Sequence, residues 1–338
     1  MARRPLIAVA WAQFQPRTVA LAAALGGEAR FIDDVGIAAA PAMRPLAYLA
    51  KSLRTWKLLT RDDPETVLVI TPPVFAPLVA WLWCTTHRRT LLVDCHTGAF
   101  HSSRWAWARP LHKIVLKQAR ATLLHTQELR DLAAAWGARA LLVPDDLPEP
   151  AEAAPVSTRG DRSRVLVAGS FDSNEPVEVA LAAASLLPDI EFRFTGKPEL
   201  VPERLRLAAG DNVVFTGYLA YPVFLGELLA ADVVAVFSTD PRIMNRAAFE
   251  AVGLGRPLVL SDLPAVKSRF GSAALFCPNN PVAMARTIVQ AIGSKDELTT
   301  LSIALQTRLR SQRDAAVADL QSVIDERMEP VWRRRSAS

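Results

Sequence analysis

Short apolar runs alternate with helical stretches along almost the whole 338-residue sequence, and this alternation limits the possible fold more than any other feature. The apolar runs are predicted strands, and the segments between them carry Ala, Leu and Arg at helical spacing. This pattern is typical of α/β proteins, in which helices cover both faces of a parallel sheet. The predicted strands are Leu6–Trp11, Ala29–Phe31, Val67–Ile70, Thr90–Val93, Thr122–His125, Ala140–Val143, Arg164–Ala168, Glu191–Thr195, Asn212–Phe215, Val233–Phe237, Pro257–Leu260 and Ala274–Phe276.

A segment rich in Pro and charged residues, 144–163, interrupts the alternation and has no periodicity, as expected of a linker. The chain is long enough for two domains of ordinary size. We therefore expect a first domain at 1–150, a linker at 151–163 and a second doubly wound domain at 164–322. The last residues, 323–338, are predicted to be a helix or tail that docks on the first domain or frays. On alternation alone, a two-domain binding protein of the periplasmic type also fits.

Charge and tryptophan are unevenly distributed along the chain. The first 150 residues carry 18 Lys and Arg against 12 Asp and Glu, the rest carry 21 against 22, and seven of the eight Trp precede residue 137. Residues 51–61 and 104–117 mix spaced cations with Leu and Trp, a composition that suits the headgroup layer of an anionic membrane. A solvated basic surface over a Trp-filled core is the alternative. No nucleic-acid motif accompanies the charge, so no nucleic-acid partner is predicted.

The uncharged stretch 66–86 is long enough to cross a bilayer as a helix. Its three prolines make one continuous helix improbable, and the sequence instead predicts a buried strand, a turn and a short helix. Three cysteines, Cys84, Cys95 and Cys277, lie far apart and are expected to be reduced thiols. We expect a cytoplasmic protein without a spanning segment, with peripheral contact at the inner face of the membrane.

Residues 231–264 carry the pattern with the clearest chemical meaning. An apolar strand leads into a polar loop, and a helix opens near Asn245. The amide groups and dipole at such a helix start are a natural seat for phosphate, and Glu250 lies far enough inside the helix to accept from sugar hydroxyls. Arg242 and Arg246 are candidates for pairing with phosphate oxygens. Solvated arginines at the helix edge are the alternative.

Other predicted strands of the second half also end in small residues. A glycine at such a position lets a ligand approach the backbone closely. Together with the Glu250 helix, these strand ends predict a ligand site at the carboxyl edge of one sheet. The candidate residues are Gly169, Ser170, Gly196, Lys197, Gly217 and Tyr218.

In the first half, His96 comes directly after an apolar strand. A histidine there can act as general base on an acceptor hydroxyl, with Asp94 or a backbone carbonyl fixing its tautomer. A satisfied structural histidine is the competing interpretation. His101, His112 and His125 have no metal-ligand spacing with one another or with the cysteines, so no metal site is predicted.

Five motifs follow one another in the second half: strands ending in GS and in TG, the run NVVFTGYL, a strand ending in ST, and the run FEAVGLGRPLVLSD. Their order resembles the carboxyl-terminal domain of GT-B glycosyltransferases of the broad family-4 type, over roughly residues 160–290. In that family the glutamate of the Glu-Ala motif binds hydroxyls of the donor ribose or sugar, which the resemblance assigns to Glu250. The loop after the corresponding ThrGlyTyr strand lies beside the nucleotide base, which implicates Gly217 and Tyr218.

The first half contains ITPPVFAPL and LLVDCHTGAF, which are similar to segments of chitobiosyl-lipid β-mannosyltransferases, as is AGSFDSNEP in the second half. Two departures from the broad family stand out. Arg242 occupies the place of the first of two glutamates spaced eight residues apart. Asp172 and Glu175 stand near Gly169, where the family commonly has an Arg and a Lys that bind the diphosphate.

The resemblance implies an α/β protein of the GT-B class, with two Rossmann-like doubly wound domains facing across a cleft. It implies a metal-independent hexosyltransferase that uses a nucleotide-sugar donor and no further cofactor. The acceptors to consider are a lipid-linked glycan and a polysaccharide precursor. A catalytically silent GT-B-like partner subunit is the main alternative. A sugar-nucleotide epimerase on the same fold is another, although it needs more carboxylates than the sequence offers.

Overall fold

A computed structural model describes residues 6–33, 44–157, 160, 162–241 and 243–326. It divides the chain into two compact units, which are treated separately below. Unit 1 contains Met1–Asp146 and Ser311–Ser338, and unit 2 contains Leu147–Arg310. The chain therefore passes between the units twice, once after Asp146 and again after Arg310.

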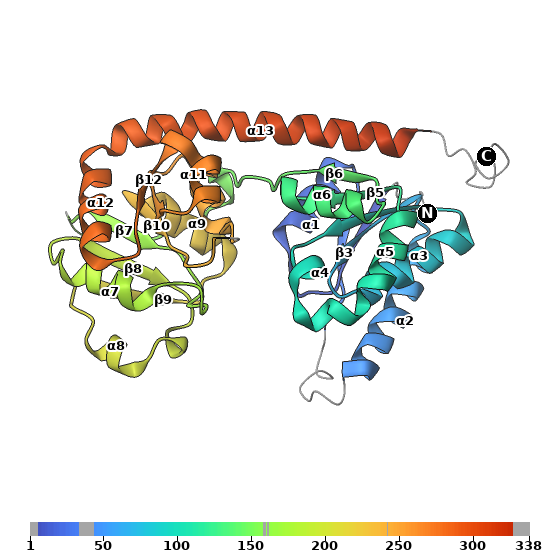
Figure 1. The fold of residues 1–338 in the computed structure, drawn as a ribbon, viewed down its shortest axis with the longest axis horizontal. Helices are drawn as coiled ribbons and strands as arrows, with labels where there is room; N and C mark the ends of the chain where they lie inside the picture. The colour runs from blue at the N-terminus through green and yellow to red at the C-terminus, as the bar shows by residue number, and fades with distance from the viewer. Residues whose placement is uncertain (1–5, 34–43, 158–159, 161, 242, 327–338) are drawn as a thin grey trace. The chain divides into compact units, whose positions relative to one another are not determined.

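Unit 1 is built on a six-stranded parallel sheet with the strand order β2-β1-β3-β4-β5-β6 (Figure 1). The central strands are buried along their whole length, as expected for a sheet covered on both faces. The strands are β1 (Leu6–Ala10), β2 (Glu28–Phe31), β3 (Thr66–Thr71), β4 (Thr90–Cys95), β5 (Ala121–Leu124) and β6 (Ala140–Leu142).

Helices cover both faces of this sheet. On one face, α1 packs with the last turns of the long helix α13 (Lys295–Asp325), which contribute Leu320 and Val323 to the core. The opposite face carries five helices that enclose the largest core cluster of unit 1. The helices of unit 1 are α1 (Pro16–Ala24), α2 (Arg44–Asp62), α3 (Phe75–His87), α4 (Gly98–His101), η2 (Ser103–Ala108), α5 (Arg109–Gln118) and α6 (Gln127–Ala135).

Unit 2 contains a second six-stranded parallel sheet, with the order β12-β11-β10-β7-β8-β9 (Figure 1). Helices α7 and α12 cover one face, and α9, α10, α11 and the first half of α13 cover the other. The strands are β7 (Arg164–Val167), β8 (Glu191–Thr195), β9 (Val213–Gly217), β10 (Val233–Val236), β11 (Leu258–Ser261) and β12 (Ala274–Cys277). The helices are η3 (Pro150–Glu152), α7 (Val177–Ser185), η4 (Pro198–Leu200), α8 (Glu203–Leu207), α9 (Tyr221–Ala230), α10 (Arg246–Gly253), α11 (Pro264–Phe270), η5 (Gly271–Ala273) and α12 (Pro281–Gly293).

All twelve predicted strands are present, each within two residues of its expected ends. The uncharged stretch 66–86 forms strand β3 and most of helix α3, as predicted. Within the described ranges, no helix has the length and apolar character needed to span a bilayer. The expected domain limit at residue 322 falls inside α13, and most of the expected tail, 327–338, lies outside the described residues.

In each sheet the strand order reverses at one pair of neighbouring strands, β1 and β3 in unit 1 and β7 and β10 in unit 2. Doubly wound sheets bind ligands at such points, outside the carboxyl ends of the strands. The predicted site residues that the structure describes lie at or after the carboxyl ends of β4, β7, β8, β9 and β10.

Candidate functional site

Helix α10 of unit 2 begins as the sequence predicts. The side-chain oxygen of Asn245 accepts from the backbone nitrogen of Ala247 at 3.0 Å and so caps the helix. Arg246 directly follows this cap, and its Nε donates at 2.8 Å to Oε1 of Glu250, which lies one turn further along the helix. Glu250 is only 5% exposed. This ion pair fixes both side chains at the start of the helix, next to its positive end. Arg242 lies outside the described residues.

Tyr221, at the start of α9, belongs to the same cluster although the sequence did not single it out. Burial raises the pKa of its hydroxyl, the nearby Glu250 carboxylate raises it further, and Arg246 opposes both. Tyr221 therefore stays a neutral phenol. Its only sequence signal is its place four residues after the predicted Gly217 turn.

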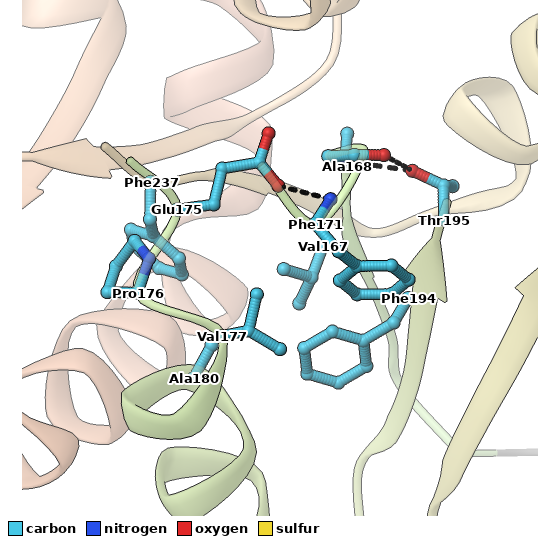
Figure 2. Close-up of a pocket in the computed structure, with 11 residues that line it drawn as sticks. Val167, Ala168, Phe171, Glu175, Pro176, Val177, Ala180, Phe194, Thr195 and Phe237 are labelled. Atoms are coloured by element: carbon cyan, nitrogen blue, oxygen red, sulfur yellow. Dashed lines mark hydrogen bonds between the residues drawn. The ribbon is translucent and has the colours of Figure 1, made fainter. Parts of the chain in front are cut away.

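The loop after β7 contains Gly169 and Ser170, which were expected to face a ligand. Instead, the carboxylate of Glu175 accepts from the backbone nitrogens of Ser170 at 3.0 Å and Phe171 at 2.8 Å. Figure 2 shows Glu175 turned towards the nitrogen of Phe171. Burial raises the pKa of Glu175, and the hydrogen bonds from the loop oppose this. A carboxylate of the chain thus fills a backbone nest of the kind that binds anions.

Asn174 joins this loop to the loop after β10. Its side-chain nitrogen donates to Ser238 Oγ at 3.3 Å, and its carbonyl oxygen accepts from the backbone nitrogen of Thr239 at 2.7 Å. Asn279 adds a hydrogen bond at 2.9 Å to the carbonyl oxygen of Ser238. These bonds order the two loops that flank the strand reversal between β7 and β10, where a ligand is expected.

Two pockets lie at this edge of the unit 2 sheet. The first is an open pocket of about 300 Å³, open solvent included, beneath the Gly169 loop, and three aromatic rings, Phe171, Phe194 and Phe237, line it (Figure 2). The second, of about 280 Å³, lies at the start of α10, where Asn245 contributes to its lining. The second pocket therefore combines apolar walls with the polar end of a helix, a composition typical of small-molecule sites.

The predicted glycines after β8 and β9 each adopt a left-handed backbone, with φ of +115° at Gly196 and +78° at Gly217. A Cβ atom at Gly196 would lie 2.8 Å from the ring of Phe171, so glycine is required for this packing. Lys197 Nζ lies 5.9 Å from the centre of the Tyr218 ring, which is 80% exposed. The structure thus brings both strand ends to the same edge as the Gly169 loop.

In unit 1, Asp94 lies at the carboxyl end of β4, with Oδ2 3.2 Å from Nε2 of His96. Burial alone would raise the pKa of Asp94, but Arg17 and His96 hold it well below its usual range, so the carboxylate is charged. Two groups meet His96 Nε2: the Asp94 carboxylate, which only accepts, and the Gln15 amide nitrogen at 3.2 Å, which only donates. The contact with the charged carboxylate is the stronger of the two, so it favours the tautomer with hydrogen on Nε2 and the lone pair on Nδ1. The His96 side chain is 28% exposed and so remains accessible.

Three neighbours of His96 were not predicted from the sequence. Gln15 Nε2 lies 3.2 Å from His96 Nε2, the ring centre of His125 lies 5.8 Å from that of His96, and Arg17 binds Asp94 directly. Gln15 and Arg17 open α1 immediately after the loop that follows β1. The sequence could have pointed to Gln15 and Arg17 only through their place at the start of this helix, and many polar residues occupy such a place.

Two further histidines of unit 1, His101 and His112, have ordinary surroundings. His112 is fully buried against Thr71, and burial lowers its pKa to about 4, so it is a neutral structural residue. His101 lies 3.8 Å from Glu128 on the surface. In the part of the chain that the structure covers, no three His, Cys, Asp or Glu side chains are grouped so that they could hold a metal ion.

Two parallel α/β units, each with polar groups at its strand ends, are the architecture that GT-B proteins have. Residues 162–294 match the family model described as glycosyl transferases group 1, so unit 2 contains a glycosyltransferase domain. Transfer of a sugar from a nucleotide-sugar donor to an acceptor is the activity that this domain indicates. No curated protein sequence matches the chain significantly.

Solved structures support the fold over nearly the whole chain. Sucrose-phosphate synthase from Thermosynechococcus elongatus has a TM-score of 0.69 at 18% identity, covering 99% of this chain and all of the other. Anabaena HepE in complex with UDP and glucose has a TM-score of 0.68 at 14% identity, covering 96% of this chain and all of HepE. A glycosyltransferase from Rickettsia africae has a TM-score of 0.69 at 10% identity, covering 97% and 100%.

Proposed function

We propose that the donor is a uridine diphosphate sugar and that its diphosphate sits at the start of α10. The observation that carries this proposal is the start of α10, where Asn245 caps the helix and lines a pocket of about 280 Å³, and where the Arg246–Glu250 pair follows on the same helix. The amides of a helix start and a guanidinium suit phosphate oxygens, and a nearly buried carboxylate suits sugar or ribose hydroxyls. HepE, which has the same fold, was solved with UDP and glucose and with UDP-glucose.

The remaining predicted residues of unit 2 complete this proposed donor site. Gly217 and the exposed ring of Tyr218 provide a flat surface for the base, with Lys197 beside it. Gly169, Ser170 and Gly196 lie at the same edge of the sheet, where Glu175 has to leave the Ser170 amide before a ligand can approach the backbone closely. The helix dipole and Arg246 stabilise the charge that develops on the leaving diphosphate, so this transfer uses no metal ion and no cofactor besides the donor.

In the proposed reaction, an acceptor hydroxyl oxygen bonds to the anomeric carbon as the bond from that carbon to the diphosphate breaks. His96 takes the hydroxyl proton on Nδ1. Asp94 supports this step because it holds the ring through Nε2 and stabilises the imidazolium that forms. Unit 1 therefore activates the acceptor and unit 2 binds the donor.

The acceptor is proposed to be lipid-linked and to be met at an anionic membrane surface on the cytoplasmic side. Helix α2 carries exposed apolar side chains at helical spacing, and no Asp or Glu occurs between Arg44 and Arg61. An amphipathic helix with cations beside an apolar stripe suits the interfacial layer. The exposed apolar residues of this stripe are Leu46, Leu49, Leu53 and Trp56.

Neighbouring helices extend this composition. Between Thr66 and Gln127 the only acidic residue is Asp94, which is buried. Side chains exposed on α3, η2 and α5 include Leu82, Trp107, Ile114, Arg104, Lys113 and Lys117. Positive charge without exposed carboxylates favours anionic lipid over a neutral partner.

A silent GT-B-like partner subunit is the second candidate, and Glu175 favours it. Its carboxylate occupies the Ser170 and Phe171 amides and adds negative charge near the proposed diphosphate site. An epimerase has less support, because Glu175 and Glu250 are the carboxylates for which the described contacts suggest a role in the donor site.

Calorimetric titration with a panel of UDP- and GDP-sugars tests the donor assignment. We expect UDP-sugars to bind the wild type and Glu250→Ala to weaken binding at least tenfold, the loss expected for hydrogen bonds to a charged group. Glu199→Ala, at an exposed position in the same unit, should bind like the wild type. Absence of nucleotide binding would refute the enzyme assignment, and binding without turnover on lipid acceptors would favour the silent subunit.

A further inference from the structure

Arg17 is a buried charge of unit 1 that is bound on both sides. Its side chain is 2% exposed, and it spans two carboxylates that lie far apart in the sequence. The Nε atom donates to Asp94 Oδ2 at 3.0 Å and Oδ1 at 3.1 Å, and Nη2 donates to Asp94 Oδ1 at 3.0 Å. On the other side, Nη1 donates to Asp145 Oδ1 at 2.8 Å, and Nη2 donates to the carbonyl oxygen of Val143 at 2.9 Å.

These contacts restrict how Asp94 can meet His96. A guanidinium that binds both oxygens of a carboxylate fixes its plane as well as its position. One of these oxygens, Oδ2, is the atom that lies 3.2 Å from His96 Nε2. Any displacement of Arg17 therefore moves the oxygen that orients the imidazole.

The contacts between Arg17 and Asp94 also offset part of the negative charge that the Asp94 carboxylate presents to His96. A bare carboxylate beside a histidine strongly favours the imidazolium, whereas a carboxylate paired with a guanidinium does so less. Burial lowers the pKa of Arg17, but Asp94 and Asp145 raise it beyond this effect, so the guanidinium keeps its charge. A base that must accept a proton near neutral pH is effective only while it is still neutral.

We propose that Arg17 is a positioning residue for sugar transfer, which holds the Asp94 carboxylate against His96 Nε2 and offsets part of its charge at the imidazole. This inference rests on the proposed role of His96 as the base. Arg17 need not touch either substrate. It acts through Asp94, and Asp145 holds it from the far side.

Several other groups face this network and share in its charge balance. His125, after β5, interacts with His96, Asp94, Arg17 and Asp145. Arg313 of α13 lies close enough to Arg17, Asp145 and Asp146 to interact with all three. Asp146 and Arg313 flank the two points where the chain leaves and re-enters unit 1. Through Arg17, Asp94 therefore belongs to the same charge network as the residues at these two points.

The test is an NMR titration of the His96 ring in the full chain, assigned with His96→Gln, for the wild type and for Arg17→Gln, Arg17→Lys and Asp145→Asn. Arg17→Gln should move the His96 titration to higher pH, because the charge of Asp94 is no longer offset. Arg17→Lys keeps a charge without the planar fork, so it should give a smaller rise. Asp145→Asn leaves the Asp94 contacts in place and should change the pKa of His96 least.

The acidic limb of the pH profile of kcat/KM should move upwards together with the titration in Arg17→Gln. An unchanged His96 titration would overturn the positioning role. If Arg17→Gln does not fold, the test uses Arg17→Lys, and an unchanged His96 titration in that variant would likewise overturn the positioning role. A separate control addresses the proposed function: transfer at the wild-type rate by His96→Gln would refute the base role itself, whatever the titration of the Arg17 variants shows.

Discussion

The carboxylate of Glu175 accepts a hydrogen bond from the backbone nitrogen of Phe171 at 2.8 Å, in a loop that faces the proposed donor site. Glu175→Ala should release the loop amides and remove a negative charge near the diphosphate. We expect the affinity for UDP to rise about threefold to tenfold, roughly 1 kcal/mol of binding free energy. Calorimetric titration at low ionic strength measures this change.

Asp172→Asn is the matched control for the Glu175 variant. Asp172 carries the same charge in the same loop but contacts only the Ser170 hydroxyl there, at 2.8 Å. Its removal should increase the affinity less, because the backbone amides stay occupied. An equal gain in both variants would mean that charge alone governs the effect, and unchanged or weaker binding by Glu175→Ala would contradict the prediction.

Acid should destabilise unit 1 through Asp94. Although burial would raise its pKa, Arg17 and His96 hold the pKa below the ordinary value of about 4. A group whose pKa is lowered on folding contributes stability above its unfolded pKa, and this contribution is lost as the pH falls towards the folded pKa. We therefore expect thermal melts of the wild type to show falling stability below about pH 4.

Asp94→Asn tests the origin of this acid sensitivity. It breaks a buried ion pair and should cost about 3 kcal/mol at pH 7, while the decline between about pH 4 and pH 2 becomes shallower. Asp319→Asn, at an exposed position of α13 in the same unit, should follow the wild-type curve. An Asp94→Asn curve parallel to that of the wild type would show that other carboxylates cause the decline.

The strands, the α10 cap and the Glu250 position were predictable because they depend on neighbours in the sequence. Apolar runs bounded by turn residues define each strand locally, and Asn245 lies at the helix start that it caps. The Arg17 network was not predictable, because its contacts with Asp94 and Asp145 cross 77 and 128 residues. Asp94 was singled out beside His96, but Arg17 and Asp145, each taken alone, resemble ordinary surface charges.

Other features depend on which of two possible partners a side chain or helix packs against, and the composition of the sequence does not determine this. Glu175 was seen as a departure from the family pattern, but the sequence does not tell whether such a carboxylate faces solvent or its own loop. In α13, Leu305 and Leu309 pack in unit 2, whereas Leu320 and Val323 pack in unit 1. One uninterrupted helical pattern therefore hides the return of the chain to unit 1 after Arg310.

Gly226 of α9 should not tolerate a side chain. A Cβ atom there would overlap the carbonyl oxygen of Ala154 and lie 2.9 Å from Val156 Cγ1. Gly226→Ala should lower the free energy of unfolding of unit 2 by about 2 kcal/mol, because overpacked sites must shift their backbone. Urea unfolding provides the measurement. Gly293→Ala, in open space at the end of α12, should change stability by less than about 1 kcal/mol; equal losses would show that the clash is relieved at little cost.

The exposed stripe on α2 should bind vesicles that contain anionic phospholipid. Replacing Leu49 and Leu53 together by Glu removes apolar area from the stripe and adds two negative charges. We expect at least a tenfold loss of binding in a sedimentation assay, since each charge near an anionic surface is worth about 1 kcal/mol. Wild-type binding should also weaken at high salt and on neutral vesicles.

The control for the α2 variant makes the same substitutions at two exposed leucines of unit 2, Leu200 and Leu207. This variant has the same net charge as the α2 variant, so any difference between them reports the location of the stripe and not the total charge. It should lose only the small part of binding that follows from net charge. Equal losses in the two variants would refute α2 as the membrane-binding face, and a wild type that ignores anionic vesicles at low salt would refute membrane contact altogether.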